Sequence, residues 1–66
     1  EVLRREHVQV QTAFGPIRIK VGWLGGDRLQ ASPEHKDCAQ AALAHDQPLR
    51  SVYAAAQAAY RSAHPE

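Results

Sequence analysis

The chain has 66 residues, of which 44% are hydrophobic, and its formal net charge is +1 at pH 7. A chain of this length forms one small domain with a thin core, and the near-neutral charge argues against nucleic acid or an anionic membrane as a partner. No segment has the roughly 20 apolar residues of a transmembrane helix. The single cysteine excludes an internal disulfide and favours a reducing compartment, so we expect a cytoplasmic protein. Because the chain begins with Glu1 rather than methionine, we interpret residues 1–66 as one module of a longer protein.

The first predicted element is a β-strand over residues 7–12. Its residues alternate between two sides, as expected for a strand that is buried on one side only. The Phe14-Gly15-Pro16 segment predicts a turn, because glycine adds conformational freedom and proline fixes φ. The two sides of the strand carry Val8, Val10 and Thr12 against His7, Gln9 and Gln11.

The second strand, residues 17–23, has the clearest alternation in the chain. Its apolar side includes Trp23, which we expect to be the largest core side chain, and its opposite side carries Arg18 and Lys20. Gly25-Gly26-Asp27 predicts a second tight connection, and residues 28–31 are short enough for an edge strand. Together the three strands predict an antiparallel meander. The apolar side of the second strand consists of Ile17, Ile19, Val21 and Trp23.

At Ser32-Pro33 the hydrophobic period changes to that of a helix. We expect Ser32 to cap the helix and Pro33 to occupy its first turn, where a missing N–H costs nothing. Asp46-Gln47-Pro48 ends this helix and begins a second one, which carries a regular apolar stripe. The expected packing faces are Cys38, Ala41, Ala42 and His45 on the first helix, and Leu49, Val52, Tyr53, Ala56 and Tyr60 on the second.

These elements predict an α+β fold of order β-β-β-α-α. We expect a two-layer sandwich in which both helices cover the apolar side of a three-stranded antiparallel sheet. That side carries Val8, Val10, Ile17, Ile19, Val21 and Leu29.

The polar side of the sheet is the first candidate site. Arg18, Lys20 and Arg28 supply guanidinium and ammonium donors that suit a triphosphate, although a solvated sheet face has the same polar character. Glu34 and Asp37, one helical turn apart, suit either a divalent cation or the helix dipole. A nickel site at His35, Cys38 and His45 is disfavoured, because His45 lies two turns beyond Cys38, about 10 Å along the axis. The sequence does not identify ligands for a metal ion.

Three motifs in register resemble the C-terminal end of the nickel-insertion protein of the lactate racemase system. They are Thr12-x-x-Gly15-Pro16-x-Arg18-x-Lys20, Pro33-Glu34-x-x-Asp37-Cys38 and Pro48-Leu49-x-x-Val52-Tyr53-x-x-Ala56, and they span roughly residues 4–60. The family usually has an aromatic residue where His35 stands and often an acid where Lys36 stands.

The resemblance implies a parent enzyme that inserts nickel, its substrate, into an organic pincer precursor and uses CTP with Mn or Mg. It implies that residues 1–66 are a single C-terminal module that contributes to the nucleotide site or to oligomer assembly. Its partners would be the remaining domains of the parent and copies of itself. The resemblance does not single out the ligands, but the polar side of the sheet and the acidic first helical turn lead us to expect that Arg18, Lys20, Arg28 and Glu34 bind the nucleotide and its divalent cation.

Two other functions remain open from the sequence. The basic residues of the strands also fit a small RNA-binding or ribosome-associated module, against which stand the low net charge and the absence of aromatic residues at stacking positions. The alanine-rich second helix also fits a purely structural module for protein contacts or oligomerisation. No serine or threonine has a histidine at motif spacing, so we do not expect residues 1–66 to be catalytic by themselves.

Overall fold

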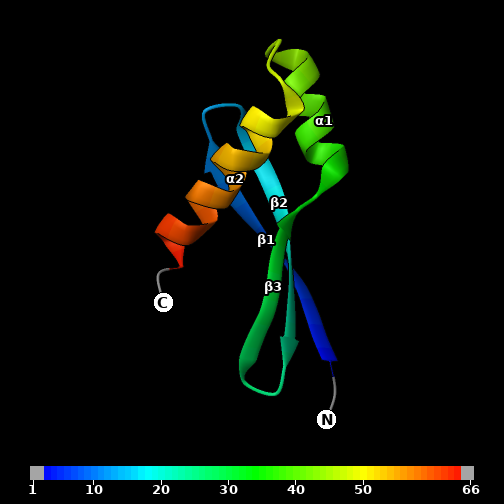
Figure 1. The fold of residues 1–66 in the computed structure, drawn as a ribbon, viewed down its shortest axis with the longest axis vertical. Coiled ribbons are helices and arrows are strands. Elements are labelled where there is room, and N and C mark those ends of the chain that lie inside the picture. The colour runs from blue at the N-terminus through cyan, green and yellow to red at the C-terminus, as the bar shows by residue number, and fades with distance from the viewer. Residues whose placement is uncertain (1–2, 65–66) are drawn as a thin grey trace.

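The fold is that of a computed structural model, which describes residues 3–64 apart from the side chains of residues 3, 4, 24, 28 and 29. Three antiparallel strands in the order β1-β2-β3 are followed by two helices that lie on one face of the sheet (Figure 1). This is the predicted α+β order. The elements are β1 (Leu3–Thr12), β2 (Gly15–Leu24), β3 (Asp27–Pro33), α1 (His35–Ala44) and α2 (Leu49–Ala63).

The β1–β2 hairpin turns earlier than the sequence predicts. The turn consists of Ala13 and Phe14, and Gly15 is already the first residue of β2, opposite Thr12. The Thr12 side chain closes the turn, because its Oγ1 accepts a bond from the Phe14 N–H at 3.0 Å and donates to the Gly15 carbonyl at 2.8 Å. Gly15 has φ +100°, a conformation that favours glycine.

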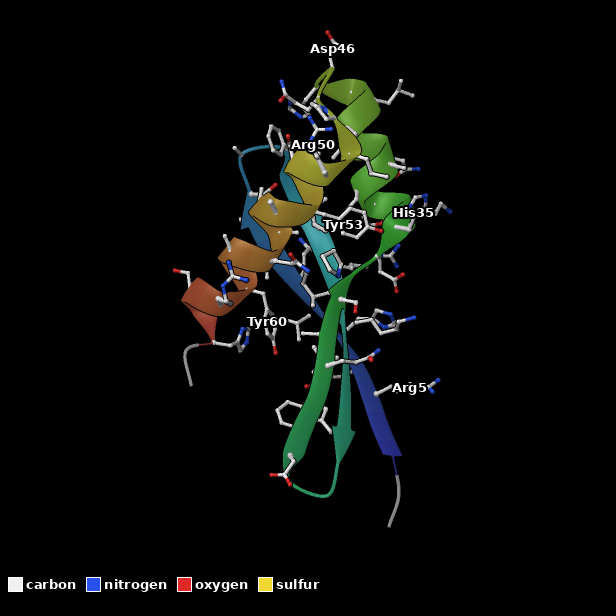
Figure 2. The ribbon with its side chains drawn as sticks, in the orientation of Figure 1. Arg5, His35, Asp46, Arg50, Tyr53 and Tyr60 are labelled. Carbon is white, nitrogen blue, oxygen red and sulfur yellow. The ribbon has the colours of Figure 1, made fainter. Side chains whose placement is uncertain are left out.

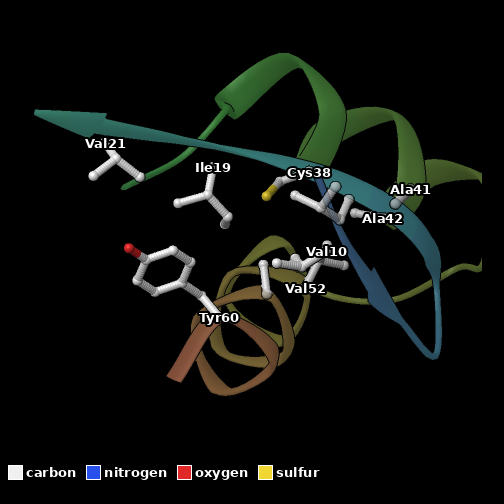
Figure 3. Close-up of a cluster of buried hydrophobic side chains, with 10 residues drawn as sticks. Val10, Ile19, Val21, Cys38, Ala41, Ala42, Val52 and Tyr60 are labelled. Atoms are coloured by element: carbon white, nitrogen blue, oxygen red, sulfur yellow. The ribbon is translucent and has the colours of Figure 1, made fainter. Parts of the chain in front are cut away.

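The core lies between the sheet and both helices (Figure 3). Half of its bulky members come from β2, whereas α1 contributes only small side chains, which allow the helix to approach the sheet closely. The buried set confirms Val10, Ile17, Ile19 and Val21 of the predicted apolar side, whereas Val8 is half-buried against the core. The side chain of Leu29 lies outside the described residues. The core residues are Val10, Ile17, Ile19, Val21, Cys38, Ala41, Ala42, Val52, Ala56 and Tyr60.

The prediction that Ser32-Pro33 starts the first helix is wrong. Ser32 pairs with Lys20 and Pro33 with Ile19, so both residues still belong to β3. Glu34 occupies the N-cap position without a side-chain capping bond, and its N–H donates to the Arg18 carbonyl at 2.8 Å. Sheet pairing therefore continues to the residue before the helix.

Three predicted core positions also differ in the structure. His45 is exposed at the C-terminal end of α1, where its ring meets Phe14 edge-on with centroids 5.6 Å apart. Trp23, the next-to-last residue of β2, is only half-buried and packs against the margin of the core. Leu49 is 37% exposed at the start of α2. The helices thus cover only part of the sheet, and the molecule is elongated, with extents of 42 × 21 × 15 Å.

Candidate functional site on the polar face of the sheet

The face of the sheet opposite the helices is polar, as predicted, and we call it the polar face. The strand register arranges its residues in rows that cross all three strands. One row is His7, Lys20 and Ser32, and the next is Arg5, Gly22 and Gln30. The exposed side chains of the polar face are Arg5, His7, Gln9, Gln11, Arg18, Lys20 and Gln30.

Arg18 forms a bidentate ion pair with Asp37 in the first turn of α1. Its Nη2 donates to Asp37 Oδ1 at 2.8 Å and its Nε to Oδ2 at 2.9 Å. The Arg18 main-chain N–H also donates to Oδ2, at 3.0 Å. The hydrogen-bonded Arg18 guanidinium lowers the pKa of Asp37 from 3.8 to about 2, so the carboxylate is ionised at neutral pH. Both groups are occupied with holding α1 against β2.

A second link connects His7 on β1 with Glu34 at the start of α1. The His7 Nε2–H donates to Glu34 Oε2 at 2.8 Å, across the intervening strand β2. This bond and the Arg18–Asp37 pair both join α1 to the polar face. Glu34 retains one carboxylate oxygen for which the structure gives no partner.

Lys20 and Arg5 differ from Arg18, since neither has a hydrogen bond or ion pair within the described part of the chain. Both side chains are exposed, and they flank Gly22 in adjacent rows. A Cβ added to Gly22 would meet only the Cγ of Gln30, at 3.8 Å, so the sheet surface is open there. The result is a shallow, cationic part of the polar face with amide donors at its rim.

The predicted site residues thus fall into three groups. Arg18 and Glu34 have partners that hold the fold, Lys20 is available, and the Arg28 side chain lies outside the described residues. Arg5 and Gly22 were missed as site residues, although the alternation of β1 extends back to Arg5 and would have placed it on the polar face.

The structure gives no support to a metal site at His35, Cys38 and His45. Cys38 is fully buried, and burial together with the nearby Asp37 charge raises the pKa of its thiol. The His35 Nδ1 lies 3.2 Å from the Tyr53 hydroxyl. Both side chains are labelled in Figure 2. Within residues 3–64, no three histidine, cysteine or carboxylate side chains come together as metal ligands.

The family model for nickel insertion proteins matches residues 1–53. The chain belongs to the nickel insertion protein family. A relative from Myxococcus xanthus is 44% identical over 59 residues, which are 89% of this chain and 15% of that protein. The pyridinium-3,5-bisthiocarboxylic acid mononucleotide nickel insertion protein of Geobacillus kaustophilus is 42% identical over 56 residues, 85% of this chain and 14% of that protein.

A solved structure has the same fold. LarC2, the C-terminal domain of a cyclometallase involved in the synthesis of the NPN cofactor of lactate racemase, matches in its apo form with a TM-score of 0.82. The match is 33% identical and covers 91% of this chain and 41% of that chain. The chain therefore spans less than half of the solved domain and about a seventh of its curated relatives.

Neither helix of the described residues is long and apolar enough to cross a membrane.

Proposed function

We propose that this chain is the terminal module of a cytoplasmic enzyme that inserts nickel into an organic pincer precursor, and that its polar face contributes to a CTP site. The observation that carries the nucleotide part is the unpartnered pair Lys20 and Arg5 beside the open surface at Gly22. Phosphate oxygens need several donors at once, and the strand register puts an ammonium, a guanidinium and an amide at neighbouring positions of the polar face.

The residues also fit a divalent cation that arrives with the nucleotide. Mg²⁺ is usually held by one or two carboxylates together with substrate phosphates rather than by a full set of protein ligands. Glu34, which keeps one free oxygen, can supply a carboxylate, whereas both oxygens of Asp37 accept bonds from Arg18. The cation, Mn or Mg, would screen the phosphate charges, and nickel is the substrate of the parent enzyme.

In this proposal the chain binds and orients the nucleotide, and the chemical step belongs to other parts of the parent protein. Lys20 and Arg5 would hold phosphate oxygens, while the two links to α1 keep Glu34 fixed beside the polar face. A second proposed role is in assembly, with the remaining domains of the parent and further copies of the module as partners. The small core supports that role, because so few bulky side chains stabilise the isolated module only modestly.

Calorimetric titration with CTP, in the presence of Mg or Mn, tests the nucleotide site on this chain and on the full-length protein. We expect the full-length protein to bind CTP, and we expect Lys20→Ala to weaken or abolish that binding. Arg50→Ala is the matched control, because Arg50 is an exposed cation on the helical layer (Figure 2). Absence of CTP binding to both forms contradicts the nucleotide role. Binding of RNA that falls steeply with salt would favour the RNA-binding alternative instead.

A further inference from the structure

A groove lies between α2 and the edge strand β3, on the side of the sheet that carries the helices. It forms because α1 packs mainly on α2 and β2, while α2 packs more extensively on β1 than on β3. The helix-facing side of β3 is therefore covered only in part. The groove has a volume of about 350 Å³, at the lower end of the range of about 300–1,000 Å³ that is typical of small-molecule pockets.

The floor of the groove is apolar. The strand register puts Ile19 opposite Pro33, and Ala31 is the next residue on the same side of β3. Tyr60 of α2 also lines the groove, and its ring lies beside Ile19 in Figure 3. Ile19, Pro33 and Tyr60 are buried, so the floor belongs to the margin of the core. A ligand that rests there displaces water from an apolar surface, which favours binding.

The rim of the groove is polar and positively charged. Gln57 and Arg61 are one turn apart on α2, and both side chains are exposed. Neither has a hydrogen bond or an ion pair within the part of the chain that the structure describes. Gln30 adds an amide at the edge of the sheet, where it borders the polar face as well. Among the described residues, none that lines the groove is acidic, so the charge of Arg61 is not neutralised there.

The position of Arg61 in the helix explains only part of this arrangement. A cation in the last turn of a helix suits the helix dipole, and Arg61 occupies that turn. The dipole does not require an apolar floor or an open groove beside the cation. A guanidinium fork matches the two oxygens of a carboxylate. The fork beside an apolar floor therefore fits a ligand with an apolar body and a carboxylate head.

We infer that the groove between β3 and α2 binds a small aromatic carboxylate. The ring rests on the apolar floor, and the carboxylate accepts two parallel bonds from the Arg61 guanidinium, beside the Gln57 amide. The volume suits one ring with its head group rather than a partner helix, whose diameter is about 10 Å. The site lies on the opposite side of the sheet from Lys20, so the inference does not depend on the CTP site proposed above.

Titration with benzoate tests the site on this chain and on the full-length protein. Ligand-detected NMR measures the affinity on both, and amide shifts locate the bound benzoate on this chain. We expect a dissociation constant of about 1 mM, as is usual for so small a ligand. The shifts should gather at Ala31, Gln57 and Arg61, and the amides of Arg5 and Lys20 should stay unchanged.

Arg61→Gln should weaken benzoate binding by about tenfold, because it removes a charge-assisted pair of hydrogen bonds. Arg50→Gln is the matched control, since it removes the same charge from the same helix at an exposed site outside the groove. The control should bind benzoate as the natural chain does. Arg61→Lys keeps the charge without the fork, so its affinity should fall between those of the natural chain and Arg61→Gln.

Three further ligands separate the ring from the charge. Acetate has the carboxylate without the ring, benzamide has the ring without the charge, and inorganic phosphate has another anionic head. All three should bind more weakly than benzoate. Equal binding of acetate or phosphate overturns the inference, because the groove is then only a surface cation.

The inference is also overturned if benzoate fails to bind up to about 20 mM, where even weak specific binding is visible. Equal losses in Arg61→Gln and Arg50→Gln, or shifts confined to the polar face, overturn it as well. Binding by this chain but not by the full-length protein has the same consequence, because another part of the parent then covers the groove. Thermal melts of each variant confirm that it is folded.

Discussion

At the scale of single residues, Arg18 and Lys20 are successive residues on the polar face of β2, but only one of them has a bonding partner in the described structure. Arg18 is held by Asp37 through three hydrogen bonds, two from its side chain and one from its main chain, whereas Lys20 has no partner within the described residues. Sequence alternation places both on the polar face but cannot distinguish them. The distinction depends on Asp37, which α1 brings to β2 from 19 residues away.

The first prediction concerns the acid sensitivity of the Arg18–Asp37 pair. The folded-state pKa of Asp37, about 2, lies below its ordinary value of 3.8, so the pair stabilises the fold fully above the ordinary value. This contribution is lost as the pH falls from 3.8 towards 2, because the unfolded chain takes up the proton first. Urea unfolding across this range should show the loss in the natural chain and a smaller loss in Asp37→Asn. Equal acid sensitivity in both chains would contradict the assignment.

The second prediction concerns Lys20. Because its side chain is exposed and unpartnered, Lys20→Ala should change the free energy of unfolding by less than about 0.5 kcal/mol. In the full-length protein the same change should weaken CTP binding by about tenfold, as expected for the loss of one charge-assisted contact. Thermal unfolding and calorimetry measure the two quantities. A variant that fails to fold would show that Lys20 is buried in an interface.

At the scale of elements, the strands follow from the sequence more closely than the helix start does. The period-two alternation of β1 and β2 is repeated in their burial, because one side of the sheet faces the helices and the other faces water. Ser32-Pro33 has the residues of a helix cap, yet both residues pair with β2. A local capping signal cannot reveal a competing strand partner, since that partner lies more than ten residues earlier in the chain.

The third prediction follows from this correction. If Ser32 capped α1, Ser32→Ala would cost about 1 kcal/mol of stability. Since Ser32 is a β3 residue with no capping bond, we expect the free energy of unfolding to change by less than about 0.5 kcal/mol. Denaturant titration of the natural chain and the variant measures the difference. A loss near the capping value would show that the helix begins at Ser32 in solution.

The candidate site was predictable only in part for the same reason. Lys20 and the polar face follow from alternation along each strand, which a single sequence records. The opening at Gly22 and the contribution of Arg5 depend on which residues of β1 lie opposite β2, and that register is set by a two-residue turn at Ala13 and Phe14 rather than by the predicted turn. The hydrogen bond between His7 and Glu34 likewise depends on contact across the sheet, which a single sequence does not record.

At the scale of the whole molecule, the core is small for the surface that it must stabilise. Four of its ten buried residues are alanine or cysteine, and the far end of the sheet extends beyond the helices. A domain of this size has little stability to spare when it is alone. On the assembly role proposed above, association with the rest of the parent or with further copies would add to this stability.

The fourth prediction tests this link between stability and association. If the folded chain is a dimer and the unfolded chain is not, the melting temperature must rise with protein concentration. Calorimetric melts at several concentrations should show this rise in the natural chain. A concentration-independent melt of the natural chain would mean that the monomer carries all of the stability.

The burial of Cys38 has a practical consequence for measuring how this molecule opens. The thiol is the only one in the chain, is fully covered by the core, and has a raised pKa, so alkylating reagents cannot reach a reactive thiolate in the folded state. Its rate of labelling therefore reports how often α1 separates from the sheet. If that separation is local, labelling proceeds faster than global unfolding permits; if it is global, the two rates coincide. A single chemical probe thus distinguishes whether α1 and the sheet unfold as one unit or in sequence.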